Sequence, residues 1–175
     1  MTLLDKTVEC KSAHRLCFMG IGNLDYGDDG FGVRLAQELI AAGLPNVIIG
    51  GPHPEESLQY ISDQSFEEVV FLDAIDFGAQ AGSVILTGRD DIENHFPQIS
   101  THKISLSVLA KLIESNGKTR VWLLGAQPES LKQGHLLSPK LEKTRRILTD
   151  LLLQAEPQRW CEAVQSVHDV GVHAC

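Results

Sequence analysis

A segment rich in glycine and aspartate lies near the start of the chain and reads Gly20-Ile21-Gly22-Asn23-Leu24-Asp25-Tyr26-Gly27-Asp28-Asp29-Gly30-Phe31-Gly32-Val33. Glycines let a backbone turn sharply and approach a ligand closely, and the adjacent carboxylates of Asp28 and Asp29 offer oxygen ligands or a proton acceptor. The segment follows an apolar run at 16–19 and precedes a helical pattern. We interpret it as a candidate site at a strand-to-helix corner.

Two later segments also contain side chains that could bind a metal or transfer a proton. The apolar run 69–72 ends on Asp73 and Asp76, and His102 stands just before a predicted helix or in its first turn. An acid of the first segment, an acid of the second and this imidazole form a ligand set suited to a borderline transition metal, with positions left open for water or substrate.

Each of these residues also has a purely structural interpretation. Asp28 could cap the first helix, Asp73 and Asp76 could form turns, and His102 could belong to an ordinary helix start. The other histidines have no motif around them, so surface or structural roles are expected; they are His14, His53, His95, His135, His168 and His173.

Several common enzyme motifs are missing from the sequence. The dinucleotide fingerprint G-x-G-x-x-G fails because Asp25 stands where the third glycine belongs, and paired acids would repel a pyrophosphate. There is no G-x-S-x-G elbow, no H-E-x-x-H helix and no P-loop.

Apolar runs and helical patterns alternate along the chain. Strands are predicted at 16–21, 47–49, 69–72, 83–86 and 120–124, and helices from 30, from 54, at 104–113 and at 141–153. This alternation predicts a three-layer α/β/α sandwich with a mostly parallel twisted sheet, in which the strand at 83–86 is the candidate for an antiparallel one.

Polar residues follow several of these strands directly. In an open sheet of this type, ligands bind outside the carboxyl ends of the strands. We therefore expect the segments 23–29, 73–76 and 125–127 to gather at one edge.

Composition and charge narrow the classes of partner. With 43% apolar and 22% charged residues, the chain has the composition of a globular protein. The net charge of −8 provides no basic excess for nucleic acid, and the basic cluster at 140–146 is interpreted as one solvated helix face. No apolar stretch is long enough to span a membrane and no signal core is present, so a cytoplasmic location is predicted.

The four cysteines lack the spacing of a metal site or redox motif, and Cys17 is expected to pack as a small apolar residue. The predicted organisation is a loose extension at 1–13, one α/β domain at 14–156 and a tail at 157–175. A monomer is the default for a chain with one domain.

Taken together, the segments resemble the hydrogenase maturation endopeptidases over residues 16–153. The motifs that carry the resemblance are, in chain order, Gly20-Ile21-Gly22-Asn23, Gly27-Asp28-Asp29-Gly30-Phe31-Gly32-Val33, Gly50-Gly51, Phe71-Leu72-Asp73-Ala74-Ile75-Asp76-Phe77-Gly78, Ala81-Gly82, Ser100-Thr101-His102 and Leu124-Gly125-Ala126-Gln127-Pro128. Their order and approximate spacing agree with the family, and their combination is more specific than any one of them.

The resemblance implies an enzyme that removes a short C-terminal peptide from the precursor of a nickel-iron hydrogenase large subunit after nickel insertion. The family's three metal-binding positions fall on Asp29, Asp73 and His102, and Asp29 is shorter than the glutamate of some relatives. The nickel is implied to be bound already in the substrate. The family is grouped with aspartic peptidases without a clear catalytic dyad.

Two mechanisms are compatible with this resemblance. In the first, Asp29, Asp73 and His102 complete the coordination of the substrate's nickel, which polarises the scissile carbonyl or activates water. In the second, the metal only docks the substrate, and Asp28 or Asp76 is the general base.

The surrounding loops are predicted to contact the substrate, and the residues expected to do so are Gly22, Asn23, Gly27, Gly51 and Gln127. Two other functions stay open at this point. One is a non-catalytic nickel-sensing or chaperone module of the same fold, and the other is a small-molecule hydrolase or phosphorylase, which the acidic loop disfavours.

Overall fold

A computed structural model describes residues 15–95 and 104–154 of the 175-residue chain. Its strands form a five-stranded sheet in the order β2-β1-β3-β5-β4. The strands are β1 (Leu16–Ile21), β2 (Val47–Gly51), β3 (Glu68–Ala74), β4 (Val84–Gly88) and β5 (Arg120–Ala126). Strands β2, β1, β3 and β5 run parallel, and β4 runs antiparallel to β5. The predicted sheet, including its antiparallel strand, is confirmed.

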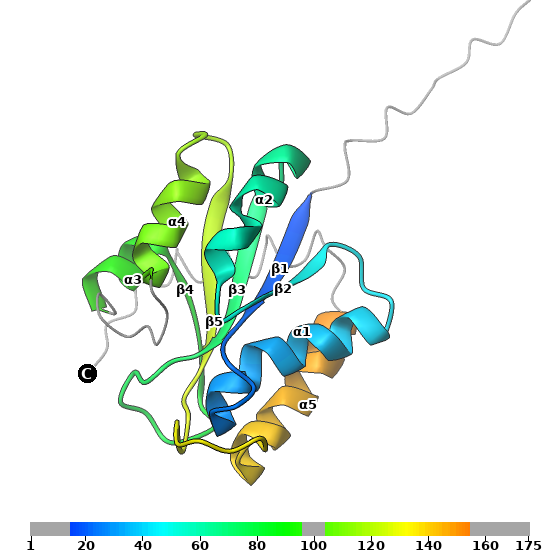
Figure 1. Cartoon of the computed structure of the whole chain (residues 1–175), viewed down its shortest axis with the longest axis vertical. Coiled ribbons are helices and arrows are strands. Elements are labelled where there is room, and N and C mark those ends of the chain that lie inside the picture. Colours follow the sequence, from blue (N-terminus) through cyan, green and yellow to red (C-terminus); the bar gives the residue numbers. More distant parts are fainter. Residues whose placement is uncertain (1–14, 96–103, 155–175) are drawn as a thin grey trace, which may run out of the picture.

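Helices cover both faces of this sheet (Figure 1). The α-helices are α1 (Phe31–Ala41), α2 (Leu58–Gln64), α3 (Arg89–His95), α4 (Leu106–Glu114) and α5 (Pro139–Gln154), and two short 3₁₀ helices are η1 (Gly27–Gly30) and η2 (Pro54–Ser57). Helices α1 and α5 lie together on one face, whereas α2, α3 and α4 lie on the other. The described residues therefore form the predicted three-layer α/β/α sandwich.

The alternation of side chains along a strand divides the apolar residues between two cores. In β1, Phe18 packs into the core under α1 and α5, while Cys17 and Met19 pack into the core under α2 and α4. Neighbouring β3 follows the same rule, with Val70 on the first side and Phe71 on the second. Burial on both faces explains why these parallel strands read as continuous apolar runs.

The start of α1 lies unusually close to the sheet. A Cβ atom added to Gly32 would lie 1.9 Å from the carbonyl oxygen of Leu72 and 2.5 Å from that of Ile21. A Cβ atom on Gly20 would in turn lie 2.5 Å from the carbonyl oxygen of Gly32. These two glycines allow the helix to begin directly against the ends of β1 and β3, which is where the acidic segment must pass.

Helix α3 was not predicted from the sequence. Its seven residues, Arg-Asp-Asp-Ile-Glu-Asn-His, contain a single apolar side chain, Ile92, which is fully buried in the second core. One apolar residue produces no helical periodicity, and the helix is held by its contacts with α4, β4 and β5.

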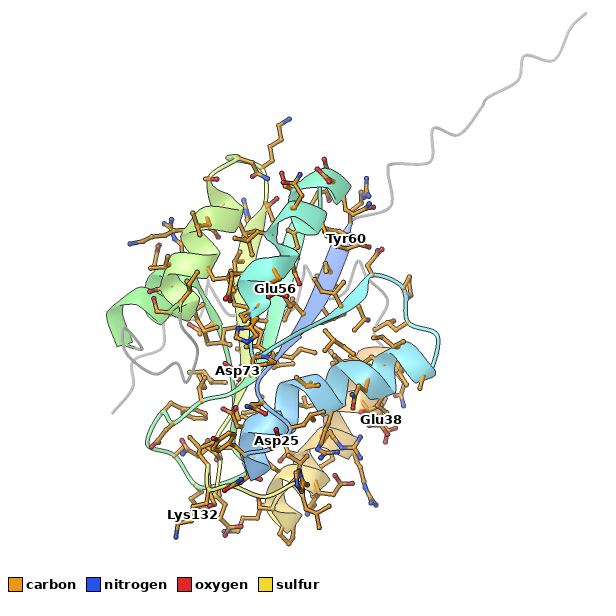
Figure 2. The ribbon with its side chains drawn as sticks, viewed as in Figure 1. Asp25, Glu38, Glu56, Tyr60, Asp73 and Lys132 are labelled. Carbon is orange, nitrogen blue, oxygen red and sulfur yellow. The ribbon has the colours of Figure 1, made fainter. Side chains whose placement is uncertain are left out.

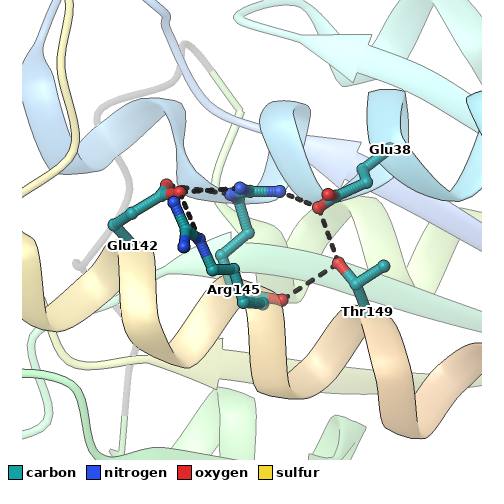
Figure 3. A network of polar contacts seen from close by, with 5 residues as sticks. Glu38, Glu142, Arg145 and Thr149 are labelled. Atoms are coloured by element: carbon teal, nitrogen blue, oxygen red, sulfur yellow. Dashed lines mark hydrogen bonds and ion pairs between the residues drawn. The ribbon is translucent and has the colours of Figure 1, made fainter.

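The interpretation of 140–146 as one solvated helix face is wrong for Arg145, whose side chain is only 14% exposed. Figure 3 shows it between Glu38 of α1 and Glu142 of α5, with an ion pair to each. Thr149 donates its hydroxyl hydrogen to Glu38 over 2.8 Å. This network joins the two helices of one layer, which a cluster of charges in the sequence does not reveal.

The predicted extension at 1–13 and the predicted tail at 157–175 lie outside the described residues, so the domain boundaries stay predictions. Among the helices of the described part, none has the length and apolar character required to cross a membrane.

Candidate active site

The polar segments that follow the strands meet where the carboxyl ends of the parallel strands lie, as expected. Asp73 near the end of β3 pairs with Gly125 of β5, and the amide of Ile75 donates to the carbonyl of Ala126 over 3.0 Å. At the other side of β1, the amide of Gly22 donates to the carbonyl of Gly51 over 3.1 Å. The acidic segment therefore lies between the ends of β2 and β3.

Asp29 belongs to η1 and is 3% exposed. Its Oδ2 atom accepts a hydrogen bond from the amide of Asn23 over 2.7 Å, which closes the loop between β1 and α1. The carboxylate is thereby held inside the loop that the glycines form.

Asp73 is 2% exposed, and its Oδ1 atom accepts from the amide of Ala74 over 2.8 Å (Figure 2 labels Asp73). Burial raises the pKa of this carboxyl well above its usual range, and the nearby negative charge of Asp29 raises it further, against the lowering effect of the Ala74 amide. The fold therefore brings two acids from different strand ends into one buried, electrostatically coupled pair.

The third predicted ligand, His102, lies outside the described residues. Within 15–95 and 104–154, no three His, Cys, Asp or Glu side chains gather closely enough to hold a metal ion. The described part of the site thus contains the carboxylate pair, and the assignment of His102 stays a prediction.

Asp28 does not cap the first helix, because Gly30 occupies that position without a side-chain cap. Its carboxylate, 1% exposed, instead accepts hydrogen bonds from the backbone amides of Glu129 (2.8 Å), Ser130 (3.1 Å) and Ser138 (2.6 Å). Asp28 therefore ties the segment 129–138 to the acidic loop. Its role as a general base stays a prediction.

Asp76 and Gln127 form a second hydrogen-bonded connection between loops at the carboxyl ends of the strands. The exposed Asp76 accepts from the amide of Gly78 over 3.1 Å, the turn contact expected of it, and from Nε2 of Gln127 over 2.9 Å. The bond from Gln127 lowers the pKa of Asp76, and the Gly78 amide adds to this. Oε1 of Gln127 accepts from the amides of Phe77 and Ala79, so both ends of its amide hold the loop after β3.

The remaining residues predicted to contact substrate line the same loops. Gly22, Gly27 and Gly51 are buried and have φ angles of 127°, 54° and 57°, which suit glycine. Asn23 is half-buried, and its Oδ1 atom accepts from the amide of Asp25 over 3.0 Å. Their contact with substrate stays a prediction.

The segment 129–138 received no role from the sequence. Tyr26 forms an isolated parallel bridge with Gly134, and Arg34 of α1 donates to the backbone carbonyl of His135. These partners are about a hundred residues apart along the chain, so no local pattern could have paired them. The described histidines His53 and His135 have side chains that are 46% and 79% exposed, as expected of surface residues.

A model of the hydrogenase maturation protease family, HycI, matches residues 33–155 of the chain. The chain belongs to this family. The matched residues include Asp73 and His102 and begin just after Asp29.

Individual members agree with this assignment in sequence and structure. The hydrogenase 3 maturation protease of Escherichia coli K12 is 36% identical over 112 residues, which are 62% of this chain and 70% of that protein. The crystal structure of the [NiFe] hydrogenase maturation protease HycI from Thermococcus kodakarensis superimposes with a TM-score of 0.71 at 30% identity, covering 81% of this chain and 92% of that one. The solution structure of the endopeptidase HycI from Escherichia coli gives 0.69 at 27% identity, covering 78% and 87%.

Family membership makes this protein a peptidase, as the resemblance implied. The alternative interpretations as a non-catalytic module or a small-molecule hydrolase find no support among these relatives.

Proposed function

We propose that this peptidase removes a short C-terminal peptide from the nickel-loaded precursor of a [NiFe]-hydrogenase large subunit. The nickel arrives with the substrate and is not a permanent cofactor of the enzyme. The proposal rests on one observation, the coupled pair of buried carboxylates that Asp29 and Asp73 form at the carboxyl ends of the strands.

Two acids buried next to each other are unfavourable in the ionised state, because each loses its hydration and feels the charge of the other. A cation placed between them reverses both effects. Carboxylate oxygens together with an imidazole suit a borderline divalent metal such as nickel. Under this proposal His102 supplies the imidazole, and an enzyme without substrate carries a site prepared for a cation.

In the mechanism we favour, Asp29, Asp73 and His102 complete the coordination of the substrate's nickel. The scissile peptide bond then lies beside a metal-polarised carbonyl or a metal-activated water. This arrangement explains why hydrolysis would wait for nickel, since the precursor without metal would bring no cation to the two carboxylates.

The contacts of the two alternative bases argue against the second mechanism. Both oxygens of Asp28 already accept backbone amides, and Asp28 is almost completely buried. The hydrogen bonds to Asp76 lower its pKa, which makes its carboxylate a weaker proton acceptor.

The test is a mass measurement of a nickel-loaded large-subunit precursor before and after incubation with the enzyme. We expect Asp29→Ala, Asp73→Ala and His102→Ala to reduce processing at least about a hundredfold, the usual scale for loss of a group that stabilises the transition state. Asp150→Ala is the matched control, because Asp150 is an exposed acid of α5. It should process at the rate of the unchanged protein.

Two further arms separate the parts of the proposal. Precursor prepared without nickel should keep its mass in the presence of the active enzyme. Normal processing by all three alanine variants would refute the assignment of the metal-binding residues, and an unchanged precursor mass with unaltered enzyme and nickel-loaded substrate would refute the function.

A further inference from the structure

Among residues 15–95 and 104–154, strand β2 forms one edge of the sheet, and part of its backbone faces away from β1. The amide of Phe18 donates to the carbonyl of Asn46 over 3.0 Å, and Phe18 pairs with Val47. In a parallel ladder alternate residues of a strand point their backbone groups toward the partner strand. The N–H and C=O groups of Val47 and Ile49 consequently point outward from the edge.

The sequence of β2 lacks two common protections of an edge strand, a charged side chain and a proline. Edges are commonly blocked by a charged side chain or a proline, which prevents another chain from pairing with them. Strand β2 reads Val-Ile-Ile-Gly-Gly and contains neither. The side chain of Ile49 is 46% exposed although it is large and apolar.

The carboxyl end of β2 is bonded to the loop of the candidate active site. At the end of β2, the carbonyl of Gly51 accepts from the amide of Gly22 over 3.1 Å. Asn23, which follows Gly22, donates its amide hydrogen to the carboxylate of Asp29 over 2.7 Å. A peptide that lies along β2 and continues past Gly51 therefore approaches the loop that holds Asp29.

We propose that the segment of the precursor adjacent to the scissile bond binds as an added strand along β2, through the outward backbone groups of Ile49. This inference rests on the proposed function. Addition of an extended peptide to a sheet edge is a common mode of recognition, in which main-chain hydrogen bonds supply the affinity. It suits a peptidase, because the substrate must present an extended backbone at the point of cleavage. The buried acids of η1 and β3, beyond the Gly51 end of β2, match a cation carried by the same substrate.

The decisive variant is Ile49→Pro, which removes the outward N–H while leaving the bonds between β2 and β1 in place. Proline is tolerated at an edge strand when its missing N–H would have faced outward. The matched control is Ile49→Thr, which removes the apolar side chain but keeps the N–H and the β-branched shape. Each is assayed with nickel-loaded large-subunit precursor for kcat/KM, and thermal unfolding checks that each is folded.

We expect Ile49→Pro to lower kcat/KM by about tenfold, the effect of one lost main-chain hydrogen bond and the blocked approach beside it. Ile49→Thr keeps the N–H group, so it should lose clearly less of kcat/KM than Ile49→Pro. Normal kcat/KM in the proline variant, or equal losses in both variants, would overturn the proposal. Failure of the unaltered enzyme to cut the precursor would refute the proposed function, which is a different result.

Amide hydrogen exchange provides a second measurement that does not depend on the proline variant folding. The amide of Ile49 should exchange rapidly in the free enzyme and at least about tenfold more slowly with precursor added, because it then gains a hydrogen-bond acceptor. Unchanged exchange in the complex would contradict the added strand. Slow exchange without precursor, accompanied by a dimer in light scattering, would instead assign the edge to a second copy of the chain.

Discussion

At the residue scale, the carboxyl of Asp73 is held where water cannot solvate it, beside a second acid. Asparagine has nearly the same shape, and its Oδ1 atom can still accept the amide of Ala74. We therefore expect Asp73→Asn to increase the free energy of unfolding of the metal-free protein at pH 7 while abolishing processing. Urea unfolding measures the first effect. Such a gain in stability is typical when a residue placed for function is removed.

The pH dependence of this effect follows from the raised pKa of Asp73. An unfolded aspartate ionises near pH 3.9, about the model-peptide value, whereas the folded carboxyl keeps its proton to higher pH. The folded state binds more protons in that interval, so its stability falls as pH rises from the unfolded pKa through the folded one. The advantage of Asp73→Asn should be largest at neutral pH and disappear below about pH 4. Lower stability of the variant at pH 7 would contradict this account.

Two glycines of the site differ in what an added methyl group would meet. A Cβ atom at Gly22 would lie 1.8 Å from the carbonyl oxygen of Asp29, whereas one at Gly51 would meet nothing within 4 Å. Both have positive φ angles. Gly22→Ala should therefore lower the free energy of unfolding by about 3 kcal/mol or more, and Gly51→Ala by about 1 kcal/mol. If chemical denaturation gave equal losses of unfolding free energy for the two variants, the positive φ angles alone would explain both losses.

At the scale of elements, Asp28 connects η1 to the segment that leads into α5. Asp28→Asn would place an NH₂ group against backbone amides that now donate to a carboxylate. We expect it to lower the free energy of unfolding by about 2–3 kcal/mol, measured in urea. The control is Asp25→Asn, since the Asp25 side chain is 64% exposed and should change stability by less than about 0.5 kcal/mol. Lost processing with unchanged stability would instead support Asp28 as the general base.

The elements also show where sequence patterns are sufficient. Strands β1 and β3 are buried on both faces, so continuous apolar runs identified them. Helix α3 has a single apolar residue, Ile92, and was missed for that reason. Arg145 was assigned to solvent because its partner Glu38 lies on a different helix. Periodicity reports how a segment faces the core, and it carries no information about which distant segment it touches.

At the scale of the whole molecule, strand β1 lies inside the sheet between two neighbours and two layers of helices. Its Cys17 is fully buried, and burial raises the pKa of the thiol from 9.0 to about 12. We expect Cys17 to react with a thiol reagent at pH 8 only as fast as the protein unfolds globally, because the thiolate is the nucleophile. Peptide mass mapping across a urea series measures this rate. Rapid labelling in the native state would indicate local opening of the sheet.

The chain by itself determined the layers of the fold, the strand ends that carry acids, and the family to which these segments belong. These follow from local properties, namely apolar spacing, glycine and aspartate content, and motif order. Only the tertiary structure decided that Asp73 is coupled to Asp29 while Asp28 binds the segment 129–138, although Asp28 and Asp29 are adjacent. Neighbouring side chains on a tight helical turn point in different directions, and what each one meets depends on chain segments far away in sequence.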